Sequence, residues 1–412
     1  MSSSLRSILI VSLVVPIALV LGGCTAPDPT PAPTASEATP SASDCPDGTS
    51  PRGRFCFSSD PIGGQLAAEV EVVFASDKLG AVIAGVWKDG EPVMVGALGD
   101  SMAGVPATID MHHLYGNWST PMLTTVLLQQ VDAGKLSLQD PLSTWYPDIP
   151  GSDKVTIAML ARSTSGYPHY PVMDAFLDAF HADVFRAWPI DEVISYGVAN
   201  GPLFTPGTSW LFSDTNFLLL QGVLEKATGT SVAELMRTGI WDPLGMKGVT
   251  PPTTAAKTEP VLHGYSAERG VWEDSTYWSP SWTEYAGGVA GNQEALQLFV
   301  DAFASGSLVS AKSHQEQLAP VNVGLGPNVP SKYYAMGVAV INGWIFSNPG
   351  LVGYHGAVGT LADKGWAIVI YTATGQNGNP DTASATTIFE RLSTILVPEQ
   401  PMTVDSPVPS DP

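Results

Sequence analysis

No serine in this chain is followed three residues later by a lysine. That spacing places a lysine amine one helical turn from a serine hydroxyl, where it can take the proton as the hydroxyl attacks a carbonyl. Each lysine, from Lys78 to Lys364, has a residue other than serine three positions before it. The sequence therefore contains no nucleophile–base pair of this kind on any helix.

The histidines also lack a pattern that binds a metal. His112 and His113 are adjacent, so they face different directions on any regular element. The other five show no ligand spacing: His169, His181, His263, His314 and His355. We expect no metal and no cofactor.

The elements that must position a site come from both ends of the chain. Helical periodicity covers 65–78, and strands are predicted at 81–88 and 92–99, joined by an Asp89-Gly90 hairpin turn. Further strands are predicted at 334–341 and 366–372, followed by a helix over 382–396. The middle of the chain is mostly helical.

Three segments in the middle resemble one known superfamily. They read GKLSLQDP (134–141), IAMLARSTSGY (157–167) and FTPGTSWLFSDTNF (204–217). In this order they resemble the serine β-lactamase, D-alanyl-D-alanine carboxypeptidase and esterase superfamily, over about 63–397. The resemblance implies an α+β, β-lactamase/transpeptidase-like fold: an antiparallel sheet from both termini, flanked by helices, with a mostly helical second subdomain and a groove between them.

The first catalytic motif of that superfamily is Ser-x-x-Lys. Counting back from Gly134 aligns Asn117 with the serine and Thr120 with the lysine. An amide nitrogen is not a nucleophile at neutral pH, and a threonine hydroxyl cannot accept the proton. Ser119 is two residues further along the helix than Asn117, about 200° around its axis, so we interpret it as an exposed or capping serine.

The other two motifs are degenerate as well. Phe212-Ser213-Asp214 aligns with Tyr-x-Asn, so the tyrosine hydroxyl is missing and Asp214 brings a negative charge. The third motif, Lys-Thr-Gly or His-x-Gly, falls on Tyr354-His355-Gly356-Ala357. Either Tyr354 or His355 occupies the histidine position, and neither alignment restores the motif.

A rival hydrolase interpretation rests on Ser101. The block around Gly99-Asp100-Ser101 resembles the nucleophile segment of SGNH-class esterases, and Asp178 and His181 form an Asp-x-x-His pair. That class needs the pair near the C-terminus and a parallel sheet. The superfamily alignment instead makes the segment a hairpin strand with its exit loop.

Aromatic residues gather just before Ala286-Gly287-Gly288. They are Trp272, Tyr277, Trp278, Trp282 and Tyr285. In the superfamily this segment borders the groove, where aromatic rings stack on a ligand. Packing between the subdomains is the favoured alternative.

The N-terminal residues carry targeting signals. Residues 1–23 read as a lipoprotein signal peptide, with an apolar run from Ile8 to Leu21 and a lipobox that ends at Cys24. Lipid on Cys24 predicts an extracytoplasmic protein anchored to the bacterial cell membrane.

The remaining boundaries follow from composition. Residues 24–60 hold the Pro/Thr/Ala-rich tether and a loop in which we expect a Cys45–Cys56 disulfide. Residues 61–397 form the β-lactamase-like domain, and 398–412 an acidic tail predicted to be disordered. A formal charge of −21 disfavours nucleic acid as a partner.

These observations predict a cell-envelope lipoprotein whose catalytic centre has been lost and which acts in cell-wall binding or scaffolding. The expected partners are peptidoglycan or a peptide in the groove, and the membrane through Cys24. The alternative is an active serine hydrolase, of the carboxypeptidase, β-lactamase or esterase type, that uses an unrecognised nucleophile or Ser101.

Overall fold

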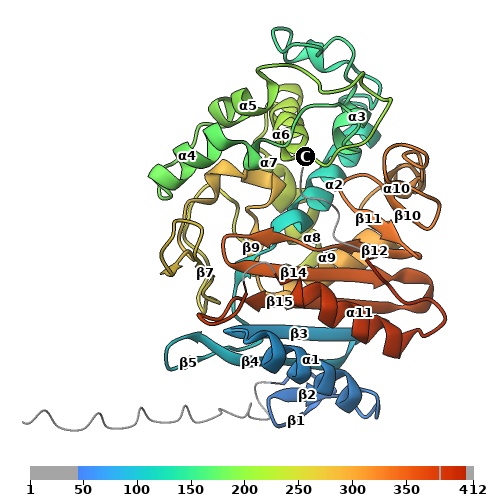
Figure 1. Cartoon of the computed structure of the whole chain (residues 1–412). Helices are drawn as coiled ribbons and strands as arrows, with labels where there is room; N and C mark the ends of the chain where they lie inside the picture. The colour runs from blue at the N-terminus through green and yellow to red at the C-terminus, as the bar shows by residue number, and fades with distance from the viewer. Residues whose placement is uncertain (1–44, 380–381, 405–412) are drawn as a thin grey trace, which may run out of the picture. The chain divides into compact units, whose positions relative to one another are not determined.

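A computed structural model describes residues 45–379 and 382–404. Its main element is an 11-stranded sheet of order β1-β2-β4-β3-β15-β14-β12-β11-β10, with β5 beside β4 and β13 beside β14 (Figure 1). Every strand pair in it is antiparallel, and β3 pairs with β15 from Ala81↔Ala373 to Lys88↔Trp366. The predicted antiparallel sheet, built from both ends of the domain, is therefore confirmed.

The strands of the described residues are β1 Ser50–Arg52, β2 Phe55–Phe57, β3 Ala81–Lys88, β4 Glu91–Met102, β5 Val105–Pro106, β6 His113–Leu114, β7 Tyr265–Ser266, β8 Glu273–Asp274, β9 Ala290–Gly291, β10 Lys332–Tyr334, β11 Ala339–Ile341, β12 Trp344–Ser347, β13 Gly350–Leu351, β14 Tyr354–Leu361 and β15 Trp366–Ala373. The α-helices are α1 Gly63–Asp77, α2 Ser119–Asp132, α3 Ile157–Ala161, α4 Asp174–Ala182, α5 Ile190–Val198, α6 Asp214–Thr228, α7 Val232–Met236, α8 Asp242–Leu244, α9 Gln293–Ser305, α10 Ala311–Leu318 and α11 Ser384–Leu396. Short helical turns are η1 Gly116–Trp118, η2 Leu142–Thr144, η3 Tyr170–Val172, η4 Arg237–Trp241, η5 Pro280–Trp282, η6 Glu284–Ala286 and η7 Ala362–Lys364.

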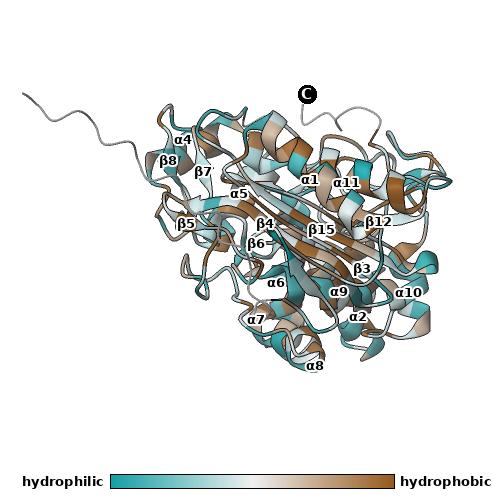
Figure 2. Cartoon of the chain, turned by 90° about the horizontal axis from the view of Figure 1, so that it is seen from below, coloured by the Kyte–Doolittle hydropathy of each residue, from teal (hydrophilic) through white to brown (hydrophobic). Residues whose placement is uncertain are grey.

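The sheet has a helical layer on each face. Figure 2 shows hydrophobic strands such as β3 and β15 between α1 and α11 on one side and α2 and α9 on the other. Alternating strand residues serve the two layers: Val82 and Ala84 belong to the core under α1 and α11, whereas Ile83 belongs to the core shared with α2 and α9. The helices from α2 to α8 form the mostly helical part that the sequence predicts.

The β3–β4 hairpin turns where the sequence predicts it. Asp89 and Gly90 have φ values of 51° and 84°, the left-handed pair that a type I′ turn requires. The expectation of one strand over 334–341 is wrong. Residues 332–341 form the β10–β11 hairpin instead, because Gly337, with φ 76°, turns the chain between them.

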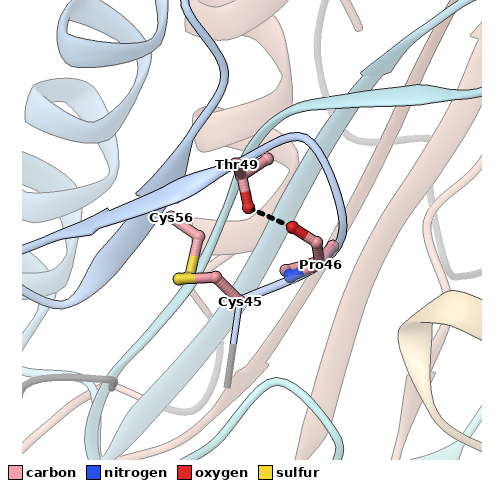
Figure 3. Close-up of a disulfide and its surroundings, with 4 residues drawn as sticks. All are labelled: Cys45, Pro46, Thr49 and Cys56. Atoms are coloured by element: carbon pink, nitrogen blue, oxygen red, sulfur yellow. Dashed lines mark hydrogen bonds between the residues drawn. A yellow bond between two sulfur atoms is a disulfide. The ribbon is translucent and has the colours of Figure 1, made fainter. Parts of the chain in front are cut away.

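The disulfide joins Cys45, which precedes β1, to strand β2 of the sheet. Cys45 and Cys56 are linked with a Cα–Cα distance of 5.6 Å, and β2, which carries Cys56, pairs with β4 (Figure 3). The signal peptide, Cys24, the tether up to residue 44 and the tail from residue 405 lie outside the described residues. Within the described residues, no helix has both the length and the hydropathy to cross a membrane.

Candidate functional site

The first motif lies where a 3-10 turn runs into helix α2. Asn117 is half-buried in η1, and Thr120 is fully buried in the first turn of α2. The Thr120 hydroxyl lies 2.6 Å from the Gly337 carbonyl oxygen and 2.8 Å from that of Asn117, and its one proton can be donated to only one of them at a time. The position that aligns with the catalytic lysine therefore holds a buried hydroxyl committed to backbone carbonyls.

The turn that carries Asn117 is fixed to the sheet by its neighbours. The indole Nε1 of Trp118 donates to the Val358 carbonyl of β14 at 3.2 Å. Ser119 is also fully buried, and its hydroxyl accepts a hydrogen bond from the backbone N–H of Val289 at 3.3 Å. The interpretation of Ser119 as an exposed or capping serine is wrong, because the whole first turn of α2 is enclosed by packed segments.

Tyr334, at the end of β10, occupies the interior between the first two motifs. Its ring lies 6.0 Å from that of Phe212 and 5.3 Å from that of Trp210, centroid to centroid. Its hydroxyl lies beside the hydroxyls of Thr120 and Ser163 but makes no hydrogen bond of good geometry. Burial raises the pKa of Tyr334 well above its ordinary value, so the phenol stays neutral.

Asp214 begins helix α6 behind Phe212. Its backbone N–H donates to Nδ1 of His169 at 3.1 Å, while its Oδ1 is buried without a partner. Burial raises the pKa of Asp214 to about 7 and lowers that of His169 to about 4. Asp214 thus carries a full negative charge only above neutral pH, so the negative charge that the sequence predicts at this position is partly neutralised at pH 7.

The third motif segment approaches the first through Pro349. A Cβ added to Gly116 would lie 2.3 Å from the Cβ of Pro349, and one added to Gly356 would lie 2.7 Å from its Cγ. Pro349 therefore packs between the turn that carries Asn117 and strand β14. At the start of β14, the buried Tyr354 donates its hydroxyl to the Leu262 carbonyl at 2.6 Å, so this side chain is engaged with the segment before β7.

His355, on the opposite face of β14 from Tyr354, lines a hollow of about 550 Å³. Its other walls include Phe176 and Leu177 of α4, Tyr265 of β7, and Trp282. Asn117, Thr120, Phe212 and Asp214 are not among its lining residues. Of the two alternatives for the third motif, His355 is the one that borders this space.

The rival interpretation based on Ser101 does not fit the structure. Ser101 lies on β4 in an antiparallel sheet, and its buried hydroxyl donates to the Val261 carbonyl and accepts from the His263 backbone N–H, both at 2.9 Å. Nε2 of His181 instead lies 3.5 Å from a carboxylate oxygen of Glu268. Ser101 and His181 therefore bond to different partners, and the parallel sheet that this class needs is absent from the described residues.

The aromatic cluster serves mainly as packing. Trp282 lies 5.8 Å from Phe176 and 5.2 Å from Phe180, and Trp278 lies 5.8 Å from Phe180, all between ring centroids. These contacts join the segment before Gly287 to helix α4. Because Trp282 also lines the hollow beside His355, the two alternatives for the cluster are compatible.

Sequence reasoning missed Tyr334, Ser163 and His169. Tyr334 comes from a hairpin far along the chain and belongs to no motif, so nothing in the sequence pointed to it. Ser163 adopts a left-handed φ of 56° inside the segment that resembles the superfamily, and that strained position gives no signal in composition. Among the described residues, no group of three or more histidine, cysteine or acidic residues is arranged to hold a metal.

Comparison with known families matches this arrangement. The sequence model of the β-lactamase family matches residues 67–393, which is most of the chain. The chain therefore belongs to the β-lactamase family, whose members include penicillin-binding proteins and D-alanyl-D-alanine carboxypeptidases.

Three relatives show the breadth of that family. Penicillin-binding protein 4* of Bacillus subtilis is 25% identical over 56% of this chain and 51% of its own length. Esterase EstB of Burkholderia gladioli is 30% identical over 46% of this chain and 52% of its own length. A D-stereospecific amidohydrolase from Streptomyces sp. superposes with a TM-score of 0.70 at 25% identity, covering 79% of this chain and 97% of that one. The chain spans about half the length of penicillin-binding protein 4* and about half the length of esterase EstB.

Proposed function

We propose that this protein is a cell-envelope lipoprotein in which a β-lactamase-like domain binds its ligand without hydrolysing it. The observation that carries the proposal is the environment of Thr120, where a hydrolase of this family needs a base. Thr120 is fully buried, its hydroxyl is committed to the Gly337 and Asn117 carbonyls, and the buried hydroxyl of Tyr334 lies beside it. Asn117 supplies no nucleophile.

A working hydrolase with another nucleophile is the alternative, since the relatives include enzymes. Ser119 and Thr120 carry hydroxyls in the first motif segment, Ser163 carries one near Tyr334, and all three residues are fully buried. A buried hydroxyl that substrate cannot reach does not act as a nucleophile. The described structure therefore favours binding over hydrolysis.

Acylation tests the proposal. Purified chain starting after Cys24 is incubated with a fluorescent penicillin and measured by gel fluorescence and intact mass, beside a carboxypeptidase with an intact Ser-x-x-Lys pair. We expect no covalent adduct on this protein and full labelling of the control. An adduct of stoichiometric amount, mapped to any serine, would refute the loss of chemistry.

The ligand that we propose is peptidoglycan or a peptide derived from it, bound in the hollow beside His355. Retention on isolated cell walls in a sedimentation assay measures this binding. Leu177→Gln, which changes a wall of the hollow, should lower retention. Leu203→Gln, at a leucine that is 62% exposed and absent from that lining, should not. Equal retention of all three proteins would contradict the assignment.

The proposed location depends on Cys24. Replacing Cys24 by alanine should release the chain from the membrane fraction, because the lipobox cysteine would carry the lipid. Fractionation after a carbonate wash measures the effect. Retention of the Cys24→Ala protein in the membrane would show that another anchor exists.

A further inference from the structure

A second hollow, of about 880 Å³, lies beside the disulfide. Cys45, Pro46 and Cys56, which Figure 3 shows together, line one side of it. Strand β4 and the first turns of helix α9 line the other sides. We call this hollow the disulfide groove. None of the three motif segments described above contributes to its lining.

The floor of the disulfide groove is apolar. Trp87, Val95, Ile109 and Leu298 line it, and Leu298 is 37% exposed although it follows the buried Gln297 on α9. A leucine left this open beside a tryptophan offers apolar area to a partner. The floor therefore favours a ligand with an aliphatic or aromatic part.

The rim of the groove is acidic. The carboxylates of Asp47, Glu91, Asp110 and Glu294 line it, and all four residues are exposed. Among the described residues, none of these four forms an ion pair with a basic side chain. The basic side chain in the lining is Arg54, whose guanidinium donates to the carbonyl oxygens of Ala97 at 3.1 Å and Ala107 at 3.2 Å. The rim is therefore complementary to a cation.

An unpaired acceptor points to the same chemistry. Gln293 lines the groove and is 3% exposed, and its side-chain Oε1 is buried without a hydrogen-bond partner. A buried carbonyl oxygen without a partner is costly, so this amide would gain by turning its oxygen toward an N–H donor bound in the groove. The acidic rim favours a ligand that carries positive charge, and the unpaired amide oxygen favours a ligand that donates hydrogen bonds.

We propose that the disulfide groove binds a basic segment of a partner protein, in which arginine or lysine side chains alternate with apolar ones. The apolar side chains lie on the floor at Trp87 and Leu298, and the basic ones meet the carboxylates of Glu91 and Glu294. The groove is larger than a single side chain requires, which fits a peptide segment. This site shares no lining residue with the hollow beside His355, so a negative result at one site does not contradict the proposal for the other.

Fluorescence anisotropy with a labelled peptide of alternating arginine and leucine tests the groove at low salt. The double variant Glu91→Gln/Glu294→Gln should bind this peptide about three- to tenfold more weakly than the unchanged protein. The matched control is Asp148→Asn/Asp178→Asn, which removes the same charge from exposed positions of the helical part, and it should bind as the unchanged protein does. A peptide of alternating glutamate and leucine should not bind.

Gln293→Met separates binding from stability. The variant removes the unpaired oxygen at similar volume, so peptide affinity should fall while the melting temperature does not. If the two charge-matched double variants weaken binding equally, the peptide is attracted by the overall negative charge and the groove is refuted. If Glu91→Gln/Glu294→Gln binds like the unchanged protein, the rim does not hold the cation and the proposal is also refuted.

Discussion

The interior around Tyr334 and the disulfide groove differ in the exposure of their polar groups. Around Tyr334, hydroxyls and a carboxyl are buried, and Asp214 has a pKa raised to about 7. In the disulfide groove, four carboxylates are exposed around an apolar floor. The region that aligns with the first two catalytic motifs of the family is a packed interior, whereas the groove has both charge and open space. Packing stability should depend on the first region, and binding of the basic partner segment on the second.

Thr120→Lys is the strongest test of the closed interior. A lysine there would bury a cation beside the Gly337 carbonyl and the hydroxyl of Tyr334, so we expect a loss of up to roughly 3–5 kcal/mol in unfolding free energy. The buried carboxyl of Asp214, which also acts on Tyr334, would offset part of this loss. Thr238→Lys is the control, since Thr238 also bonds a backbone carbonyl from a helix but is exposed. Urea denaturation measures both. Equal stabilities of the two variants would show that the interior admits a lysine.

Asp214→Asn tests the same interior through pH. The pKa of Asp214 in the folded protein, about 7, is raised above its ordinary value near 3.8, so its contribution to stability is greatest below pH 4 and is lost as pH rises toward 7. Glu284, whose pKa is also raised to about 7 by burial, acts in the same direction. The share of Asp214 alone is a loss on the order of 2–3 kcal/mol from pH 5 to pH 8. His113 and His169, whose pKa values burial lowers to about 3 and about 4, act in the opposite direction below pH 6.5, so the share of Asp214 is measured as the difference between the unchanged protein and Asp214→Asn.

The amide cannot ionise, so Asp214→Asn should flatten part of that pH dependence. Asp178→Asn, at an exposed carboxyl of α4, should leave the profile unchanged. Thermal unfolding measured from pH 5 to pH 8 compares the three proteins. A profile for Asp214→Asn identical to that of the unchanged protein would mean that this carboxyl does not titrate as its burial implies.

Local signals predicted the scaffold well because they depend on neighbours in sequence. The Asp89-Gly90 turn and the strands on either side follow from two residues that accept positive φ and from apolar flanks. The aligned motifs placed Asn117 and Phe212 at the candidate site from the sequence alone, and their role stays a prediction. Tyr334 was beyond prediction, because a side chain from the β10–β11 hairpin fills a space next to Thr120 only after the sheet has formed. The burial of Ser119 has the same origin in tertiary packing.

The smallest effect is expected for two neighbouring tyrosines, the half-buried Tyr333 and the buried Tyr334, whose hydroxyls differ in their hydrogen bonds. The hydroxyl of Tyr333 donates to the Leu318 carbonyl at 3.2 Å, whereas that of Tyr334 is buried without a good partner. Tyr333→Phe should lower the unfolding free energy by about 1 kcal/mol. Tyr334→Phe should change it by less than about 0.5 kcal/mol or raise it, since removing an unpaired buried hydroxyl relieves a desolvation cost.

Urea denaturation of both variants measures the difference, and neither should alter peptide binding to the disulfide groove. A larger loss for Tyr334→Phe than for Tyr333→Phe would mean that the phenol of Tyr334 holds Thr120 and Ser163 together through hydrogen bonds. The interior would then be a connected polar network, and its contrast with the open groove would rest on hydrogen bonding as well as on packing.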